Sequence, residues 1–101
     1  MSLVEVGKNV IVRSRDVGVF AGKLIKLEGD TATVQDSRRL WYWSGAASLS
    51  ELSQKGVIKP TECRFPIPVP EEIIFGVIEI LTLTEEAKSS IDNVSVWTAQ
   101  Q

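Results

Sequence analysis

The sequence predicts an α+β domain in which an antiparallel β-meander carries two short helices. Three observations favour this fold class. Strand-like segments rich in β-branched residues lie within residues 8–43, a helix start of the form Ser-x-x-Glu occurs at Ser48, and a second capped start occurs at Thr84. The chain of 101 residues fits one ligand-binding domain covering residues 1–101, and its composition, 44% hydrophobic and 24% charged, is that of a globular protein.

Short turns are expected to join three consecutive strands into the meander. The strands are predicted at residues 8–14, 19–27 and 31–35. Gly18 suits the first turn because glycine adopts backbone angles that other residues avoid, and Gly29 followed by Asp30 suits a hairpin. Consecutive antiparallel strands need no long crossover connection, so a meander is the simplest topology for this order.

A fourth strand is predicted over residues 38–43, after a turn at residues 36–37. Successive side chains of a strand point to opposite faces, so Arg39, Trp41 and Trp43 would share one face. That face would combine a guanidinium with two large aromatic surfaces.

The pattern then changes from strands to helix. Ser48 and Glu51 form a capping box that begins a short helix, and Gly56 is expected to end it. Prolines on both sides keep residues 63–65 extended, at a sheet edge. Residues 71–83 contain the most apolar run of the chain and are predicted to form one long, largely buried strand.

A second helix completes the predicted domain. Thr84 provides its cap, the acidic residues that follow favour the positive end of the helix dipole, and Asn93 is expected to end it. A final short strand is predicted at residues 94–97.

The charge distribution argues against binding to long nucleic acid, which normally requires a basic surface. The net charge is −2. Residues 1–65 carry seven acids and ten bases, whereas residues 66–101 carry six acids and one base. All five arginines lie in the first part, which suits a small anionic ligand better than a long polyanion.

The sequence lacks the side chains that most enzymes use. It contains no histidine, which removes the commonest general base and most catalytic zinc sites, so we expect no catalytic residue, no metal and no cofactor. Cys63 is the only cysteine, and burial as a small apolar side chain is its expected role. Residues 1–5 lack the pattern of a signal peptide, and no apolar run is long enough to span a bilayer, so we expect no membrane partner.

Arginines gather beside aromatic residues in the first 65 positions. A guanidinium offers a fork of donors to a phosphate, and an aromatic ring offers a face on which a base stacks. Arg64 and Phe65 repeat, on another segment, the pairing of Arg39 with Trp41 and Trp43. Strand aromatics also fill protein cores, and arginine often lies over tryptophan without any ligand. The residues alone leave open whether Trp41 and Trp43 face a ligand or the core.

The segment 38–52 carries a resemblance to a known family. An arginine pair, two tryptophans, a Gly-Ala pair and a capped helix follow one another there in a fixed order. Together with residues 10–14, 18–22 and 77–80, this order resembles that of the first family of Thoeris anti-defence proteins, and the similarity spans most of the chain.

The resemblance implies a phage protein that acts in the host cytoplasm and sequesters bacterial immune cyclic nucleotides without degrading them. Glycocyclic ADP-ribose is the expected ligand, with cyclic di- and trinucleotides as further ligands. The resemblance also implies a symmetric homo-oligomer, a dimer or a hexamer, with ligand sites at or near the subunit contacts. The alternative is a small structural or interaction domain, for example a virion component, whose aromatic residues pack a protein interface. The acidic net charge disfavours a third reading, a binder of single-stranded nucleic acid.

The resemblance also assigns roles to particular residues. By analogy, Phe65 stacks on adenine, Arg64 and one arginine of the 38–39 pair lie near phosphate, and further residues line the pocket. Residues 89–101 contain no arginine or lysine, which departs from the family pattern and favours a different cyclic nucleotide. The candidate ligand-binding residues are Arg13, Ser14, Val17, Gly18, Phe20, Arg38, Arg39, Trp41, Trp43, Arg64 and Phe65.

Overall fold

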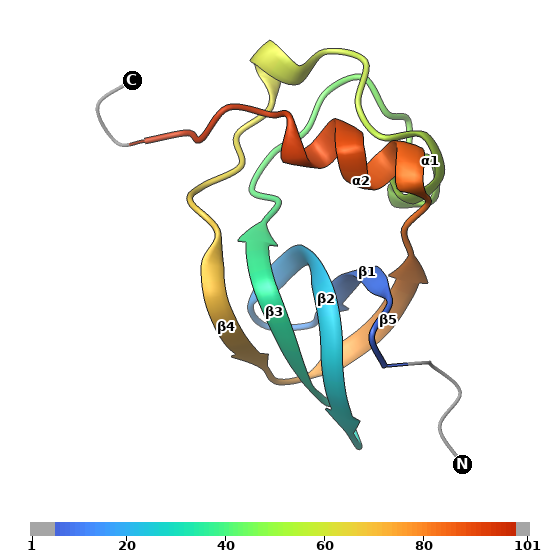
Figure 1. The fold of residues 1–101 in the computed structure, drawn as a ribbon, viewed down its shortest axis with the longest axis vertical. Coiled ribbons are helices and arrows are strands. Elements are labelled where there is room, and N and C mark those ends of the chain that lie inside the picture. Colours follow the sequence, from blue (N-terminus) through green and yellow to red (C-terminus); the bar gives the residue numbers. More distant parts are fainter. Residues whose placement is uncertain (1–5, 99–101) are drawn as a thin grey trace.

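A computed structural model describes residues 6–98 as a five-stranded antiparallel sheet with two helices at one end (Figure 1). The strands are β1 (Asn9–Ser14), β2 (Gly18–Glu28), β3 (Thr31–Arg39), β4 (Val69–Ile74) and β5 (Val77–Thr82). The helices are α1 (Leu49–Lys55) and α2 (Glu85–Asp92), and a 3-10 turn (Pro60–Glu62) lies between α1 and β4. The predicted α+β class, with an antiparallel sheet and two short helices, is confirmed.

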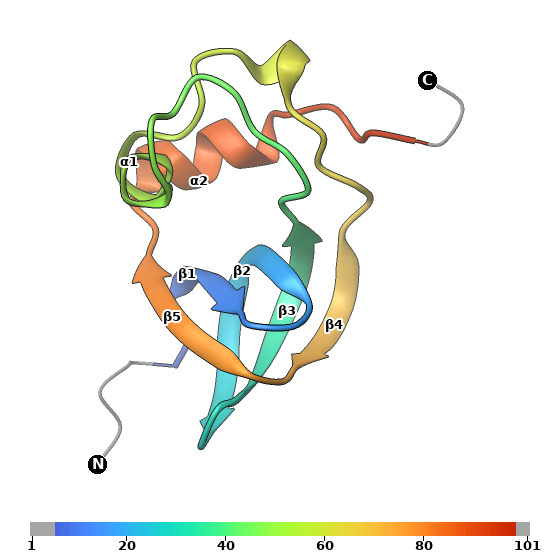
Figure 2. The ribbon, with the colours of Figure 1, turned by 180° about the vertical axis from the view of Figure 1, so that it is seen from behind.

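The strand order β4-β3-β2-β1-β5 contains the predicted meander of β1, β2 and β3. β5 returns to pair with β1, so β4 and β5 form the two edges of the sheet although they follow each other in the chain. The connection between them, residues 75–76, spans at most about 11 Å. The sheet must therefore curl to bring its edges together, and Figures 1 and 2 show this curvature from both sides.

Curling gives the sheet two buried faces, each with its own core. Strand alternation sends Ile11 and Ala21 to the face that the helices cover, and Val10, Val12 and Phe20 to the enclosed inner face. The core under the helices also contains Leu40, Leu52, Val57, Cys63, Phe65, Ile91 and Val94. The inner core also contains Leu24, Ala32, Val34 and Ile74. The buried Cys63 agrees with the expectation for this residue.

The predicted turn at residues 36–37 and the predicted strand at 38–43 are wrong. β3 continues through Asp36, whose φ of 52° marks a bulge, and ends at Arg39. The pairing of β2 with β3 shifts by one residue at Gly22, where an added Cβ would lie 2.5 Å from the Val34 side chain. Glycine at position 22 therefore makes room for the bulge, and the chain beyond Arg39 leaves the sheet.

The predicted long strand at residues 71–83 is also wrong. Gly76 adopts a φ of 70°, which favours glycine, and divides the segment into β4 and β5. Most residues of these two strands are exposed or half-buried because they form the sheet edges. The predicted strand at 94–97 is reduced to one parallel bridge between Phe65 and Val96.

Both predicted helix caps are confirmed. The Ser48 Oγ accepts a hydrogen bond from the Glu51 amide at 3.1 Å, and the Thr84 Oγ1 accepts one from the Ala87 amide at 3.0 Å. The Gly56 amide donates to the Leu52 carbonyl at 3.0 Å and ends α1 as expected. Neither α1 nor α2 is long and apolar enough to cross a membrane, and no other helix within residues 6–98 is.

Replacing Ser48 with alanine is expected to lower the free energy of unfolding by about 1 kcal/mol, because the Glu51 amide loses its acceptor at the start of α1. Urea denaturation of both forms measures this change. Ser50→Ala in the same helix is the matched control, since Ser50 is exposed and caps nothing. An equal loss in both variants would contradict a capping role for Ser48.

Candidate functional site

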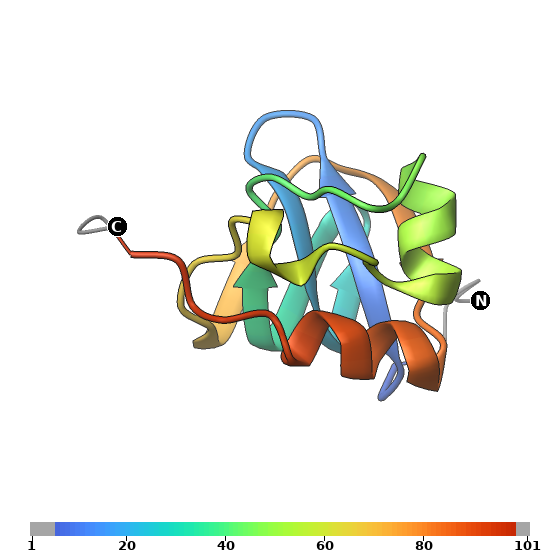
Figure 3. The ribbon, with the colours of Figure 1, turned by 90° about the horizontal axis from the view of Figure 1, so that it is seen from above.

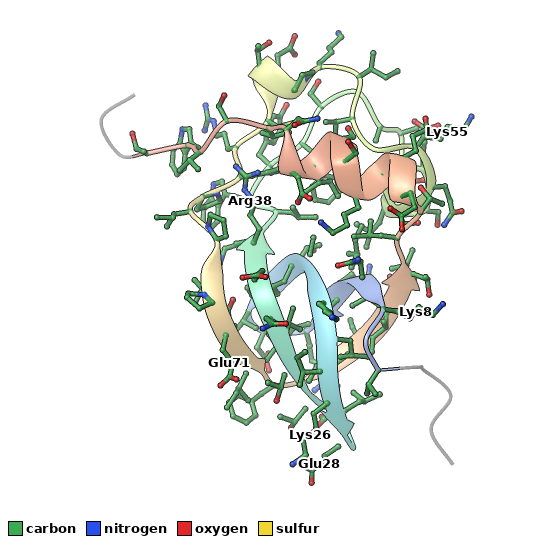
Figure 4. The ribbon with its side chains drawn as sticks, viewed as in Figure 1. Lys8, Lys26, Glu28, Arg38, Lys55 and Glu71 are labelled. Atoms are coloured by element: carbon green, nitrogen blue, oxygen red, sulfur yellow. The ribbon has the colours of Figure 1, made fainter. Side chains whose placement is uncertain are left out.

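Arg38 is a structural clamp between the sheet and the segments that cover it. Only 6% of the residue is exposed. Its guanidinium donates to the carbonyls of Pro66 at 3.1 Å, Ile91 at 2.9 Å and Phe65 at 3.2 Å. Figure 4 shows Arg38 at the end of β3, below α2. Burial lowers the pKa of Arg38, and the nearby Asp92 partly offsets this effect.

The expectation that Phe65 stacks on a base does not fit the structure, because the residue has no exposed surface. The Arg38 guanidinium lies over its ring, 5.5 Å from the centroid. Phe20 is 1% exposed and lies under the Arg39 guanidinium at 4.7 Å. Both rings are core residues covered by arginine guanidinium groups. An arginine can lie over an aromatic ring in this way without any ligand.

Ser14 and Arg13 also have structural partners. The Ser14 Oγ donates to the Phe75 carbonyl at 2.6 Å and accepts from the Asp16 and Val17 amides at 3.3 and 3.4 Å. These bonds hold the turn between β1 and β2 against the connection between β4 and β5. Arg13 lies 3.5 Å from Glu79 across the pairing of β1 with β5.

Five of the predicted residues do meet around one hollow of about 280 Å³, which we call the Arg39–Trp41 hollow. It lies between the β1–β2 turn and the chain that leaves β3. Figure 3 shows these two segments on the side of the domain away from α2. The lining of the hollow consists of Val17, Gly18, Val19, Arg39, Leu40, Trp41 and Trp43. Val19 and Leu40 were not predicted, because only the fold brings them beside the tryptophans.

The two tryptophans differ in their surroundings. Trp41 is 62% exposed, so its indole offers an open face at the rim. Trp43 is half-buried and packs against the core under the helices while also lining the hollow. Trp41 therefore faces outward, whereas Trp43 contacts both the core under the helices and the hollow.

Arg39 forms the polar wall of the Arg39–Trp41 hollow. Its Nη1 donates to the Val17 carbonyl at 3.0 Å, and its Nη2 lies 3.8 Å from the Glu72 Oε2. Its side chain is partly exposed, so part of the guanidinium faces solvent. Glu72 was not predicted to belong to the site, because two adjacent acidic residues are typical of a solvated acidic surface. The contact exists because β4 pairs with β3 in this register.

Arg64 belongs to a different surface. Its guanidinium lies 6.0 Å from the Tyr42 ring centroid and 5.7 Å from that of Trp97. The backbones of Tyr42 and Arg64 are hydrogen-bonded to each other at 3.2 and 2.7 Å. Arg64 does not line the Arg39–Trp41 hollow, so the predicted convergence of all these arginines on one site is not observed.

A larger hollow of about 610 Å³ lies between the sheet and α2. Three cationic residues line it, Lys23, Arg38 and Lys88. Each of the three Arg38 nitrogens already donates one hydrogen bond to a carbonyl, and Lys88 forms an ion pair with Asp92, which lines the same hollow. None of the described residues that line this hollow is aromatic, so they offer no stacking surface for a base.

Groups of three or more His, Cys, Asp or Glu side chains that could hold a metal ion are absent from residues 6–98. The residues that line the Arg39–Trp41 hollow supply one guanidinium, backbone groups and two indole rings. This set can bind an anion and stack on a flat ring.

Comparison with known proteins gives one family. The family model described as Domain of unknown function (DUF6948) matches residues 7–91, which cover all five strands and most of α2. No curated protein and no solved structure matches the chain.

Proposed function

The chain belongs to the family described as Domain of unknown function (DUF6948), and from its site we propose that it binds a small cyclic nucleotide and holds it intact. The observation that carries this proposal is the convergence of Arg39, Trp41 and Trp43 on one hollow beside the Gly18 turn. A guanidinium supplies donors for a phosphate, and the open Trp41 face supplies a stacking surface for a base. Holding a ligand intact requires no general base, and the sequence contains no histidine.

The size of the hollow supports assembly as part of the proposal. Small-molecule sites usually enclose about 300–1,000 Å³. The Arg39–Trp41 hollow, at about 280 Å³, lies below this range, so we infer that it holds part of a cyclic ligand and leaves the rest outside. A neighbouring copy of the chain would cover the remainder, so the proposed state is a symmetric homo-oligomer with the ligand at the subunit contact.

The resemblance of segment 38–52 to Thoeris anti-defence proteins supports the finer part of the proposal. On that basis the ligand is a bacterial immune signal such as glycocyclic ADP-ribose or a cyclic oligonucleotide, and the protein acts in the host cytoplasm on behalf of a phage. Sequestration lowers the free concentration of the signal, so that the host effector is not activated.

Isothermal titration calorimetry with glycocyclic ADP-ribose isomers and cyclic di- and trinucleotides tests this proposal. We expect one of these ligands to bind and to be recovered unchanged by mass spectrometry after denaturation of the complex. Sedimentation velocity tests the assembly, since a monomer at micromolar concentration would contradict a site shared between copies. Absence of heat with every ligand, from protein that unfolds cooperatively, would overturn the proposed function.

Replacing Trp41 with alanine is expected to weaken binding by about 5- to 150-fold, because base–aromatic stacking contributes about 1–3 kcal/mol. The thermal midpoint is expected to change little, because Trp41 is exposed. Tyr42→Ala is the matched control: Tyr42 is an adjacent exposed aromatic residue, and its ring contacts Arg64 instead of the hollow. Equal weakening by both substitutions would show that Trp41 is not a stacking residue.

A second candidate function, a protein-interaction domain, is favoured by exposed apolar side chains along β4, β5 and their flanks. These side chains are Ile67, Val69, Ile73, Phe75 and Ile78. Under this alternative, Ile73→Asp would abolish association with a protein partner or with a second copy, and Trp41→Ala would not. The calorimetric titration separates the two candidates, because an interaction domain binds none of the cyclic nucleotides.

A further inference from the structure

Arg39 lies across the open end of the inner core, between two acceptors. Its guanidinium covers Phe20, bonds to the Val17 carbonyl on one side and approaches Glu72 on the other. Glu72 stands opposite Val34 in the pairing of β3 with β4, and Val34 belongs to the inner core. This register directs the Glu72 side chain to the inner face, where Arg39 closes the end of the sheet.

Glu72 and an anionic ligand would compete for the same cation. Among residues 6–98, Glu72 is the one carboxylate within 4.0 Å of the Arg39 guanidinium. Arginine has five N–H donors, and one of its terminal nitrogens is already engaged by Val17. A phosphate that takes up the remaining donors comes close to the Glu72 carboxylate. The two anions repel each other across a site that is partly exposed to solvent.

We propose that Glu72 is an internal competitor that holds Arg39 in place in the free protein and selects ligands by their charge. This inference rests on the proposed function of the Arg39–Trp41 hollow. A doubly charged pyrophosphate group displaces Glu72 from Arg39, whereas an uncharged nucleoside does not. Glu72 is thus a positioning residue that weakens the binding of anions at Arg39 and leaves the affinity for uncharged nucleosides unchanged.

The matched pair Glu72→Gln and Glu71→Gln tests this role. Each substitution removes one negative charge from β4 and keeps the shape of the side chain. Glu71 is exposed on β4 (Figure 4). It stands opposite Gln35, which lines the larger hollow on the helix side. The two variants therefore have the same net charge and differ in the face of the strand that loses its carboxylate.

Titration of tryptophan fluorescence with inorganic pyrophosphate and, separately, with adenosine measures the effect at Trp41 and Trp43. For Glu72→Gln we expect pyrophosphate to bind about three- to tenfold more tightly than to the natural protein, the range expected for loss of a partly exposed ion pair and a nearby like charge. Adenosine affinity is expected to stay constant in both variants. Glu71→Gln is expected to change pyrophosphate affinity less than twofold.

Each outcome separates this inference from the proposed function. Equal tightening in both variants indicates a general charge effect and overturns the role of Glu72, as does unchanged or weaker pyrophosphate binding by Glu72→Gln. If Glu72→Gln alone tightens pyrophosphate binding while no cyclic nucleotide binds to either form, Glu72 does control Arg39 and the proposed function fails. If cyclic nucleotides bind to both forms equally, the proposed function holds and the inference about Glu72 fails.

Discussion

Replacing Arg38 with methionine is expected to lower the free energy of unfolding by about 3–5 kcal/mol. Methionine fills part of the space but donates no hydrogen bond. The carbonyls of Phe65, Pro66 and Ile91 would then lose a donor in a site from which water is largely excluded. The Phe65 and Ile91 carbonyls keep the Trp97 and Val94 amides as donors, at 3.0 and 3.1 Å, so the loss comes mainly from the three charge-assisted hydrogen bonds themselves. Such bonds contribute about 1.5–3 kcal/mol each, and the relief of burying a charge offsets part of the total.

Chemical denaturation at a fixed protein concentration measures this loss, and Arg64→Met is its matched control. Arg64 is exposed, and within residues 6–98 its side chain contacts the Tyr42 and Trp97 rings, so the control is expected to lose less than about 1 kcal/mol. Arg38→Lys is expected to remain destabilised, because one ammonium group cannot reach three carbonyls that a planar guanidinium joins. If Arg38→Met unfolded at the same denaturant concentration as the natural protein, the three hydrogen bonds would not be needed for stability.

Replacing Phe65 with alanine is expected to lower the free energy of unfolding by about 3–5 kcal/mol, the usual cost of removing a buried phenylalanine ring. Phe65 is fully buried in the core under the helices, and its backbone also pairs with Val96. Loss of the ring leaves a cavity among side chains from the sheet, α1 and α2. The Arg38 guanidinium also loses the ring that lies beneath it.

Phe75→Ala is the matched control for this substitution, because Phe75 is 64% exposed in the connection between β4 and β5. We expect it to lose less than about 1 kcal/mol in the same denaturation experiment. Phe65 and Arg38 touch, so the double variant is expected to lose less than the sum of the two single losses. A Phe65→Ala protein of natural stability that fails to bind nucleotide would instead restore the role that the resemblance gave this residue.

The two largest expected effects thus belong to residues that the sequence had suggested as ligand contacts. An arginine next to an aromatic residue has the same chemistry whether the pair binds a ligand or stabilises a core. Arg38 and Arg39 are neighbours in one strand, yet alternation sends the first toward the helices and the second toward the inner face. The candidate site therefore retained Arg39, Trp41 and Trp43 and lost Arg38, Phe65 and Phe20.

The predictions of secondary structure are confirmed where they depend on residues that are close in the sequence. Ser48, Glu51 and Thr84 cap helices through hydrogen bonds to amides three or four residues away, so their positions follow from short spacing. The hairpin at Gly29 likewise depends on a glycine with positive φ between two strands. The bulge at Asp36 was missed because it depends on Gly22, which lies on the partner strand.

The sequence by itself determined the fold class, the helix boundaries, the meander and the gathering of arginines beside aromatic residues. These features depend on periodicity, capping and turn chemistry, which act over a few residues. Only the tertiary structure decided which aromatic rings are buried, which arginine lines the Arg39–Trp41 hollow and which carboxylate faces it. Burial and pairing depend on the curl of the sheet and on the register of β4 against β3, and these contacts join residues more than thirty positions apart.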